Sequence, residues 1–84
     1  MNSKQRNTFA KIFDNPVRKN IKWTDVEKLI VSVGGSIKQA DGSRIRIDLA
    51  EYSLNIHTQH PHKELKPYQV RAIRKLFVER GLIL

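Results

Sequence analysis

Two stretches in the second half of the chain alternate strictly between apolar and polar residues. The apolar members are Ile45, Ile47 and Leu49, then Tyr52, Leu54 and Ile56; the polar members are Arg44, Arg46 and Asp48, then Ser53, Asn55 and His57. Because successive side chains of a β-strand point to opposite faces, each stretch predicts a half-buried strand. Only residues 50–51 separate the two stretches, so we expect a tight turn and antiparallel pairing.

A shorter strand is expected just before this pair. Ile37 lies in a segment that ends near Ala40, and Asp41-Gly42 is a typical hairpin-turn sequence. The three strands therefore form an antiparallel meander. One face of this sheet is apolar, and the other is open to solvent or to a ligand.

Helical spacing of apolar residues precedes and follows the strands. Residues 3–14 place Phe9, Ile12 and Phe13 on one side, and Asn15-Pro16 ends this helix because a residue before proline avoids the helical conformation. A second helix is predicted over residues 24–33. Its start is marked by the capping-box pattern Thr24-Asp25-Val26-Glu27, its apolar side by Val26, Leu29, Ile30 and Val33, and its end by Gly34-Gly35.

The last helix is expected to begin at Pro67, because proline suits the first turn of a helix. Its apolar side consists of Val70, Ile73, Leu76 and Phe77, and Gly81 ends it. The element order is thus α-α-β-β-β-α, an α+β fold in which helices cover one face of a small three-stranded antiparallel sheet. The 84 residues fit one domain, with Phe9, Phe13, Trp23 and Tyr52 assigned to its core.

The chain is strongly basic. It has 16 lysines and arginines against 8 acidic residues, a net charge of +8. Such an excess on a small domain favours nucleic acid as a partner, then an acidic protein, while a surface that only aids solubility remains the simplest alternative. Cysteine is absent, which excludes disulfides and thiolate zinc sites. With no apolar leader or membrane-length run, we expect a cytoplasmic protein without a membrane partner.

Four short segments resemble the HicA toxins in their order and spacing. They are residues 29–34 (LIVSVG), Gly42-Ser43, residues 60–65 (HPHKEL) and residues 70–76 (VRAIRKL), so the resemblance covers about residues 23–83. It implies a sheet flanked by helices, similar to double-stranded RNA-binding domains. It also implies a toxin that cleaves mRNA, inhibits translation and is neutralised by a HicB antitoxin. On this reading residues 23–84 are the family core and residues 1–22 are an N-terminal extension with a helix.

The sequence departs from the family at one position. In most HicA toxins a histidine that is taken as catalytic follows Gly-Ser by one or two residues, whereas this chain has Arg44 and Ile45 there. An arginine stays charged near neutral pH and cannot shuttle a proton. The catalytic role therefore cannot be transferred to this position.

Histidine suits proton transfer because its usual pKa lies near neutrality, so His57 and His60 are the catalytic candidates. By alternation His57 faces outward beside Arg44 and Arg46, and His60-Pro61 matches the family's loop. His57 could equally be a solvent-facing strand residue, and His60 could only shape the loop. His62 completes a His-x-x-His-x-His cluster, but the cluster lacks a fixed helical frame, so we expect neither a metal nor another cofactor.

The RNA-binding candidates are cationic or lie in the segments that carry the resemblance: Arg44, Arg46, Ser43, Lys63, Arg71, Arg74 and Lys75. Arg71, Arg74 and Lys75 are expected to share one face of the last helix, which could contact phosphates, meet an acidic antitoxin or simply face water. Tyr68 is a candidate for stacking on a base. The alternative function is a non-catalytic RNA-binding or antitoxin-binding module of the same fold.

Overall fold

A computed structural model of the chain describes residues 2–40, 42, 44–57 and 64–82. Its elements are α1 (Ser3–Ile12), α2 (Trp23–Ser32), β1 (Ser36–Gln39), β2 (Arg44–Leu49), β3 (Tyr52–His57) and α3 (Pro67–Arg80). The predicted order and the α+β class are confirmed. From α2 onward the order is α-β-β-β-α, which is consistent with a fold like that of double-stranded RNA-binding domains.

The sheet is an antiparallel meander in the order β1-β2-β3. Ile45, Ile47 and Leu49 of β2 are buried, while Arg44 and Arg46 between them are exposed. The alternation read from the sequence therefore describes the two faces correctly. We call the exposed face of the sheet the outer face.

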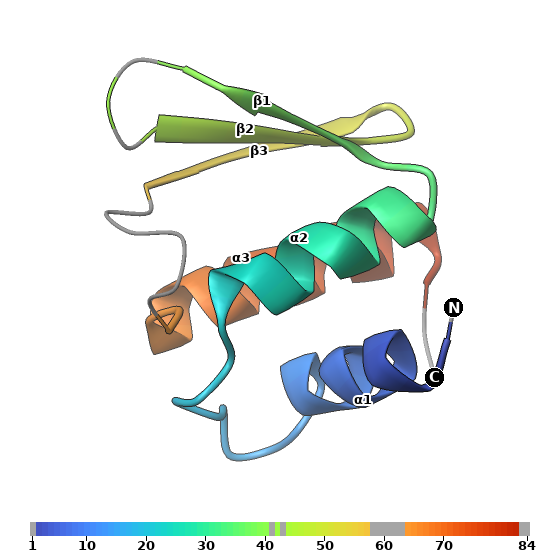
Figure 1. Cartoon of the computed structure of the whole chain (residues 1–84), viewed down its shortest axis with the longest axis vertical. Helices are drawn as coiled ribbons and strands as arrows, with labels where there is room; N and C mark the ends of the chain where they lie inside the picture. Colours follow the sequence, from blue (N-terminus) through green and yellow to red (C-terminus); the bar gives the residue numbers. More distant parts are fainter. Residues whose placement is uncertain (1, 41, 43, 58–63, 83–84) are drawn as a thin grey trace.

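Three layers follow one another through the molecule (Figure 1). The sheet forms the first layer, and α2 and α3 lie beneath its apolar face. The helix α1 forms the third layer, because it packs on α2 and α3 on the side away from the sheet. The outer face is thereby left without a covering helix among the described residues.

One buried cluster connects the three layers. Phe9, Ile12 and Trp23 belong to it, as predicted, and Phe13 and Tyr52 are partly buried against it. Val70, Ile73, Leu76 and Phe77 of α3 are also buried, as their spacing predicts. The core thus draws on every layer, including the N-terminal helix.

The start of α2 corrects the sequence interpretation. The helix begins at Trp23 and its N-cap is Lys22, which makes no side-chain cap, so Thr24 lies inside the first turn. The reason is tertiary. Lys22 forms an antiparallel bridge with Glu64, and the backbone N–H of Leu65 donates to the carbonyl of Ile21 at 2.7 Å. This pairing holds the chain extended up to Lys22 and sets the first helical residue.

The start of α1 and both ends of α3 follow local signals, whereas α1 ends at Ile12, two residues before the predicted end. A capping box that the sequence interpretation missed begins α1: the Asn2 side chain accepts from the Gln5 backbone N–H at 2.9 Å, and the Gln5 side chain accepts from the Asn2 backbone N–H at 3.0 Å. Pro67 is in the first turn of α3, and α3 ends at Gly81, whose φ of 88° is readily adopted by glycine. Both ends of α3 confirm their predictions.

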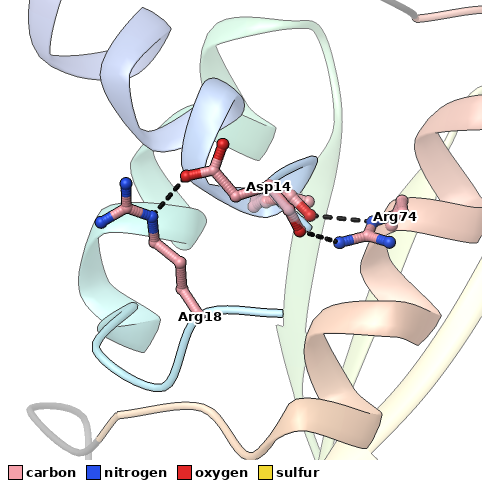
Figure 2. Close-up of polar contacts among 4 residues, drawn as sticks. Asp14, Arg18 and Arg74 are labelled. Atoms are coloured by element: carbon pink, nitrogen blue, oxygen red, sulfur yellow. Dashed lines mark hydrogen bonds and ion pairs between the residues drawn. The ribbon is translucent and has the colours of Figure 1, made fainter. Parts of the chain in front are cut away.

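Arg74 of α3 forms hydrogen bonds to the backbone at the end of α1 (Figure 2). The Arg74 Nε donates to the carbonyl of Ile12 and its Nη2 donates to the carbonyl of Asp14, each at 2.9 Å. The same guanidinium lies 5.9 Å from the ring centroid of Phe13, and the Asp14 carboxylate pairs with Arg18. Since the last carbonyls of a helix have no partner within it, Arg74 satisfies the carbonyl of Ile12 at the end of α1, together with that of Asp14 just beyond it.

We expect Arg74→Ala to lower the free energy of unfolding by about 1.5–3 kcal/mol, the usual range for lost hydrogen bonds to a charged group. Urea denaturation of the whole chain measures this difference. Arg71→Ala is the matched control, because Arg71 is exposed on the same helix; it should change the free energy of unfolding by less than about 0.5 kcal/mol. Equal denaturation midpoints for the two variants would show that the Arg74 contacts contribute nothing.

Candidate nucleic-acid interface

The outer face of the sheet gathers cationic side chains in two neighbouring rows. Lys38 of β1, Arg46 of β2 and Asn55 of β3 are paired in one row. Arg44 pairs with His57 in the next row. All five residues are exposed. The outer face therefore presents three cations and one imidazole in the same direction.

Lys38 and Arg46 are like charges directly opposite each other across two strands. Cβ atoms in such pairs are about 4.5–5.5 Å apart, and like charges at this spacing are destabilising. An anion bound between them would remove this cost. Lys38 was missed from the sequence, although its place after the inward-facing Ile37 is a signal that it points outward.

Arg46 is held in place by its neighbours. Its Nε donates to Asp48 Oδ1 at 2.9 Å, and its Nη2 donates to Ser53 Oγ at 3.2 Å. The Ser53 hydroxyl donates to the same Asp48 oxygen at 2.8 Å. The hydrogen bond from Ser53, followed by that from Arg46, holds the pKa of Asp48 below its ordinary value. The Asp48 carboxylate thus stays charged and orients the guanidinium.

His57 is held through its backbone carbonyl. The carbonyl of His57 accepts a hydrogen bond from Gln69 Nε2, and Gln69 Oε1 accepts from the Lys66 backbone N–H at 2.9 Å. Gln69 is only 5% exposed. This buried amide joins the end of β3 to the first turn of α3. It was missed from the sequence, where a glutamine in the first turn of a helix is only a weak capping signal.

Of the predicted site residues, the structure brings Arg44, Arg46 and His57 together on the outer face. Their functional roles stay predictions. Ser43, His60 and Lys63 lie outside the described residues.

The prediction that three cations share an exposed face of the last helix is wrong for Arg74. Arg71 and Lys75 are exposed, but Arg74 is partly buried and turns toward α1. The extension packs beside Arg74 and supplies backbone oxygens, which helical spacing alone does not reveal. Two of the Arg74 donors are therefore used inside the fold, and a contact between Arg74 and RNA has no support from this geometry.

Within residues 2–40, 42, 44–57 and 64–82, no three histidine, aspartate or glutamate side chains are grouped so that they could hold a metal ion. His60 and His62 fall outside these ranges. No helix in the described ranges is long and apolar enough to span a membrane.

Comparison with protein families gives one match. A family model described as "HicA toxin of bacterial toxin-antitoxin" matches residues 23–77, well over half of the chain. The match runs from the start of α2 into α3 and leaves out α1. Searches of curated proteins and of solved structures found no match.

The lowered pKa of Asp48 predicts how stability depends on pH. A carboxyl whose pKa is lower in the folded chain stabilises the fold above its unfolded pKa, and this stabilisation is lost as the pH falls through the folded pKa. We expect Asp48→Asn to remove that contribution, so that the loss of stability on acidification below about pH 4 is smaller than in the parent chain.

Urea denaturation midpoints at neutral and acidic pH measure this effect. Glu51→Gln is the matched control, because Glu51 is an exposed carboxylate in the β2–β3 turn. The same acid dependence in the parent chain and in Asp48→Asn would show that the network around Arg46 does not hold the carboxylate charged.

Proposed function

The chain belongs to the HicA toxin family, and from this membership we propose that it cleaves messenger RNA on the outer face of its sheet and so inhibits translation. As a family member it is a toxin of a toxin–antitoxin system. The observation that carries the proposal is the row-by-row placement of Lys38, Arg46, Arg44 and His57 on the uncovered face. The cytoplasm, where mRNA is translated, is the proposed location.

The cations would hold the phosphate that is attacked. Arg44 and Lys38 contact its non-bridging oxygens, while Arg46, oriented by Asp48, adds a guanidinium in a fixed direction. Negative charge grows on these oxygens as a fifth ligand approaches phosphorus. Donors that are already in place stabilise this charge without further reorganisation.

The proton transfers fall to histidine. The 2′-hydroxyl oxygen bonds to the adjacent phosphorus while its proton passes to the His57 imidazole, which lies opposite Arg44. The bond from phosphorus to the 5′ oxygen breaks, and that oxygen takes a proton from an acid, for which His60 is the candidate. The products are a 2′,3′-cyclic phosphate and a 5′-hydroxyl, and no metal takes part.

A non-catalytic module is the second candidate function. Arg44 and Ile45 occupy the positions where the resemblance to the family leads one to expect a catalytic histidine. An arginine there binds phosphate but cannot move a proton near neutral pH. In that case the chain would arrest translation by holding RNA on the same face.

A toxin of this family has a cognate antitoxin. We infer that it is a HicB-type protein with an acidic surface that covers the outer face, because opposite potentials speed encounter and fix register. Covering this face would also separate Arg44 and His57 from RNA. Inhibition and binding would then use the same residues.

We expect His57→Ala to lower the rate of RNA cleavage by about 10²–10⁴-fold, the usual cost of losing an acid–base group, and to leave RNA binding intact. His60→Ala tests the proposed acid in the same assay. Ser36→Ala is the control, since Ser36 is exposed on the same face and pairs with Asp48 away from the His57 row. If the double variant His57→Ala/His60→Ala cleaves RNA as fast as the parent, the proposal of histidine catalysis is wrong. If the parent chain and the His57→Ala/His60→Ala variant both bind RNA but do not cleave it, the non-catalytic module is the better description.

The antitoxin contact is tested by charge reversal. We expect the double variant Lys38→Glu/Arg44→Glu to associate with the antitoxin at least about tenfold more slowly, because electrostatic steering of that size is common. Stopped-flow association rates with the purified antitoxin measure this. Arg6→Glu/Lys28→Glu is the matched control, with the same change of net charge at exposed positions on α1 and α2. Equal rates for the two variants would place the antitoxin elsewhere.

A further inference from the structure

One side of α3 carries an aromatic ring followed by two cations. Tyr68 is 60% exposed, and Arg71 and Lys75 are exposed as well. Residues spaced by three and four positions lie on the same side of a helix, so the three side chains form one continuous row. We call Tyr68, Arg71 and Lys75 the α3 stripe.

The Tyr68 ring does little for the fold. The apolar side of α3 is already made by other residues, including Val70, Ile73 and Phe77, which are fully buried. Tyr68 stands on the opposite side, with most of its surface in water. A single exposed aromatic residue is ordinary, but one that continues into two cations matches the arrangement that binds single-stranded nucleic acid.

The stripe begins beside the proposed catalytic row. The next residue after Tyr68 is Gln69, whose buried amide donates to the carbonyl of His57. The first turn of α3 therefore lies against the end of β3. His57 and Arg44 form the last cross-strand pair at that end of the sheet. The end of the sheet that carries Arg44 and His57 is therefore the end beside which α3 and its stripe begin.

We propose that the α3 stripe binds single-stranded RNA, with one nucleobase stacked on the Tyr68 ring and phosphates bound by Arg71 and Lys75. The choice of RNA as ligand rests on the proposed function. The stripe narrows the substrate to an unpaired strand, because a base must be unstacked from its neighbours to lie on a side-chain ring.

An acidic protein fits this surface less well than RNA does. The centre of a protein–protein interface is apolar and depleted of lysine, although tyrosine and arginine are enriched there. Here the neighbours of Tyr68 along the stripe are both cationic, and the other large exposed apolar side chain described on α3 is Val78, near the opposite end of the helix. Stacking plus phosphate binding uses all three residues of the stripe.

The test measures binding of two anionic ligands to full-length chains that carry His57→Ala, so that RNA is not consumed. The ligands are a fluorescent single-stranded oligoadenylate and an inorganic polyphosphate, which has the charge without the bases. Adding Tyr68→Ala should weaken oligoadenylate binding about 5- to 160-fold, the range for one lost base stack, and leave polyphosphate binding unchanged. Tyr68→Phe keeps the ring and should restore binding to within about twofold of the parent.

Two further variants separate charge from stacking. Arg71→Gln/Lys75→Gln should weaken binding of both ligands and flatten the salt dependence. Val78 is half exposed on the same helix, and Val78→Ala should change the binding of neither ligand. The proposal is overturned if Tyr68→Ala binds oligoadenylate as tightly as the parent, or if it weakens only binding of the antitoxin.

Failure of the proposed function gives a different result. In that case the chain without any substitution would not cleave RNA, while Tyr68→Ala in the His57→Ala background would still lose oligoadenylate affinity. An unpaired substrate is checked by annealing an oligoribonucleotide of mixed sequence to its complement. The duplex should lose the sensitivity to Tyr68→Ala that the single strand shows, and equal sensitivity would contradict stacking on an unpaired base.

Discussion

The packing of the sheet's inner face on α2 and α3 determines where every other functional group can lie. Ile45, Ile47 and Ile56 belong to the same buried cluster as Leu29 and Ile73. A shift of one residue in either strand would place isoleucine in water and arginine in the core, so the register is strongly specified. The pleat then forces the intervening residues outward. The cationic rows are a direct consequence of how the apolar residues are buried.

Much of the sheet could be predicted for this reason. Alternation placed His57 on the same face as Arg44 and Arg46 from the sequence alone, because it depends only on local periodicity, and the structure adds that Arg44 and His57 are a direct pair. The apolar side of α3 and the end of this helix at Gly81 could also be predicted, because both depend on residues that are close in sequence. What could not be predicted depends on contacts between distant segments. The bridge between Lys22 and Glu64 set the start of α2 against the capping pattern.

Contacts across the fold also explain why the role of Gln69 was missed and why Arg74 was given the wrong surroundings. Gln69 resembles an ordinary helix-start residue until its amide is seen on the carbonyl of His57. Arg74 resembles a surface cation until α1 is placed beside it. Lys38 could have been found, since its strand is short but its position after Ile37 is unambiguous. A side chain's neighbours along the chain are known from sequence, whereas its partners across the fold are not.

The contact between Arg74 and α1 joins a segment inside the family match to one outside it. Ile12 and Ile21 before the match are as buried as the residues within it, so we infer that residues 1–22 fold together with the rest. A relative that lacks the first helix would leave a guanidinium at this position without its carbonyl acceptors and beside bare apolar surface. Water would satisfy the freed guanidinium, so the apolar surface that α1 now covers is what a chain without this helix would have to change.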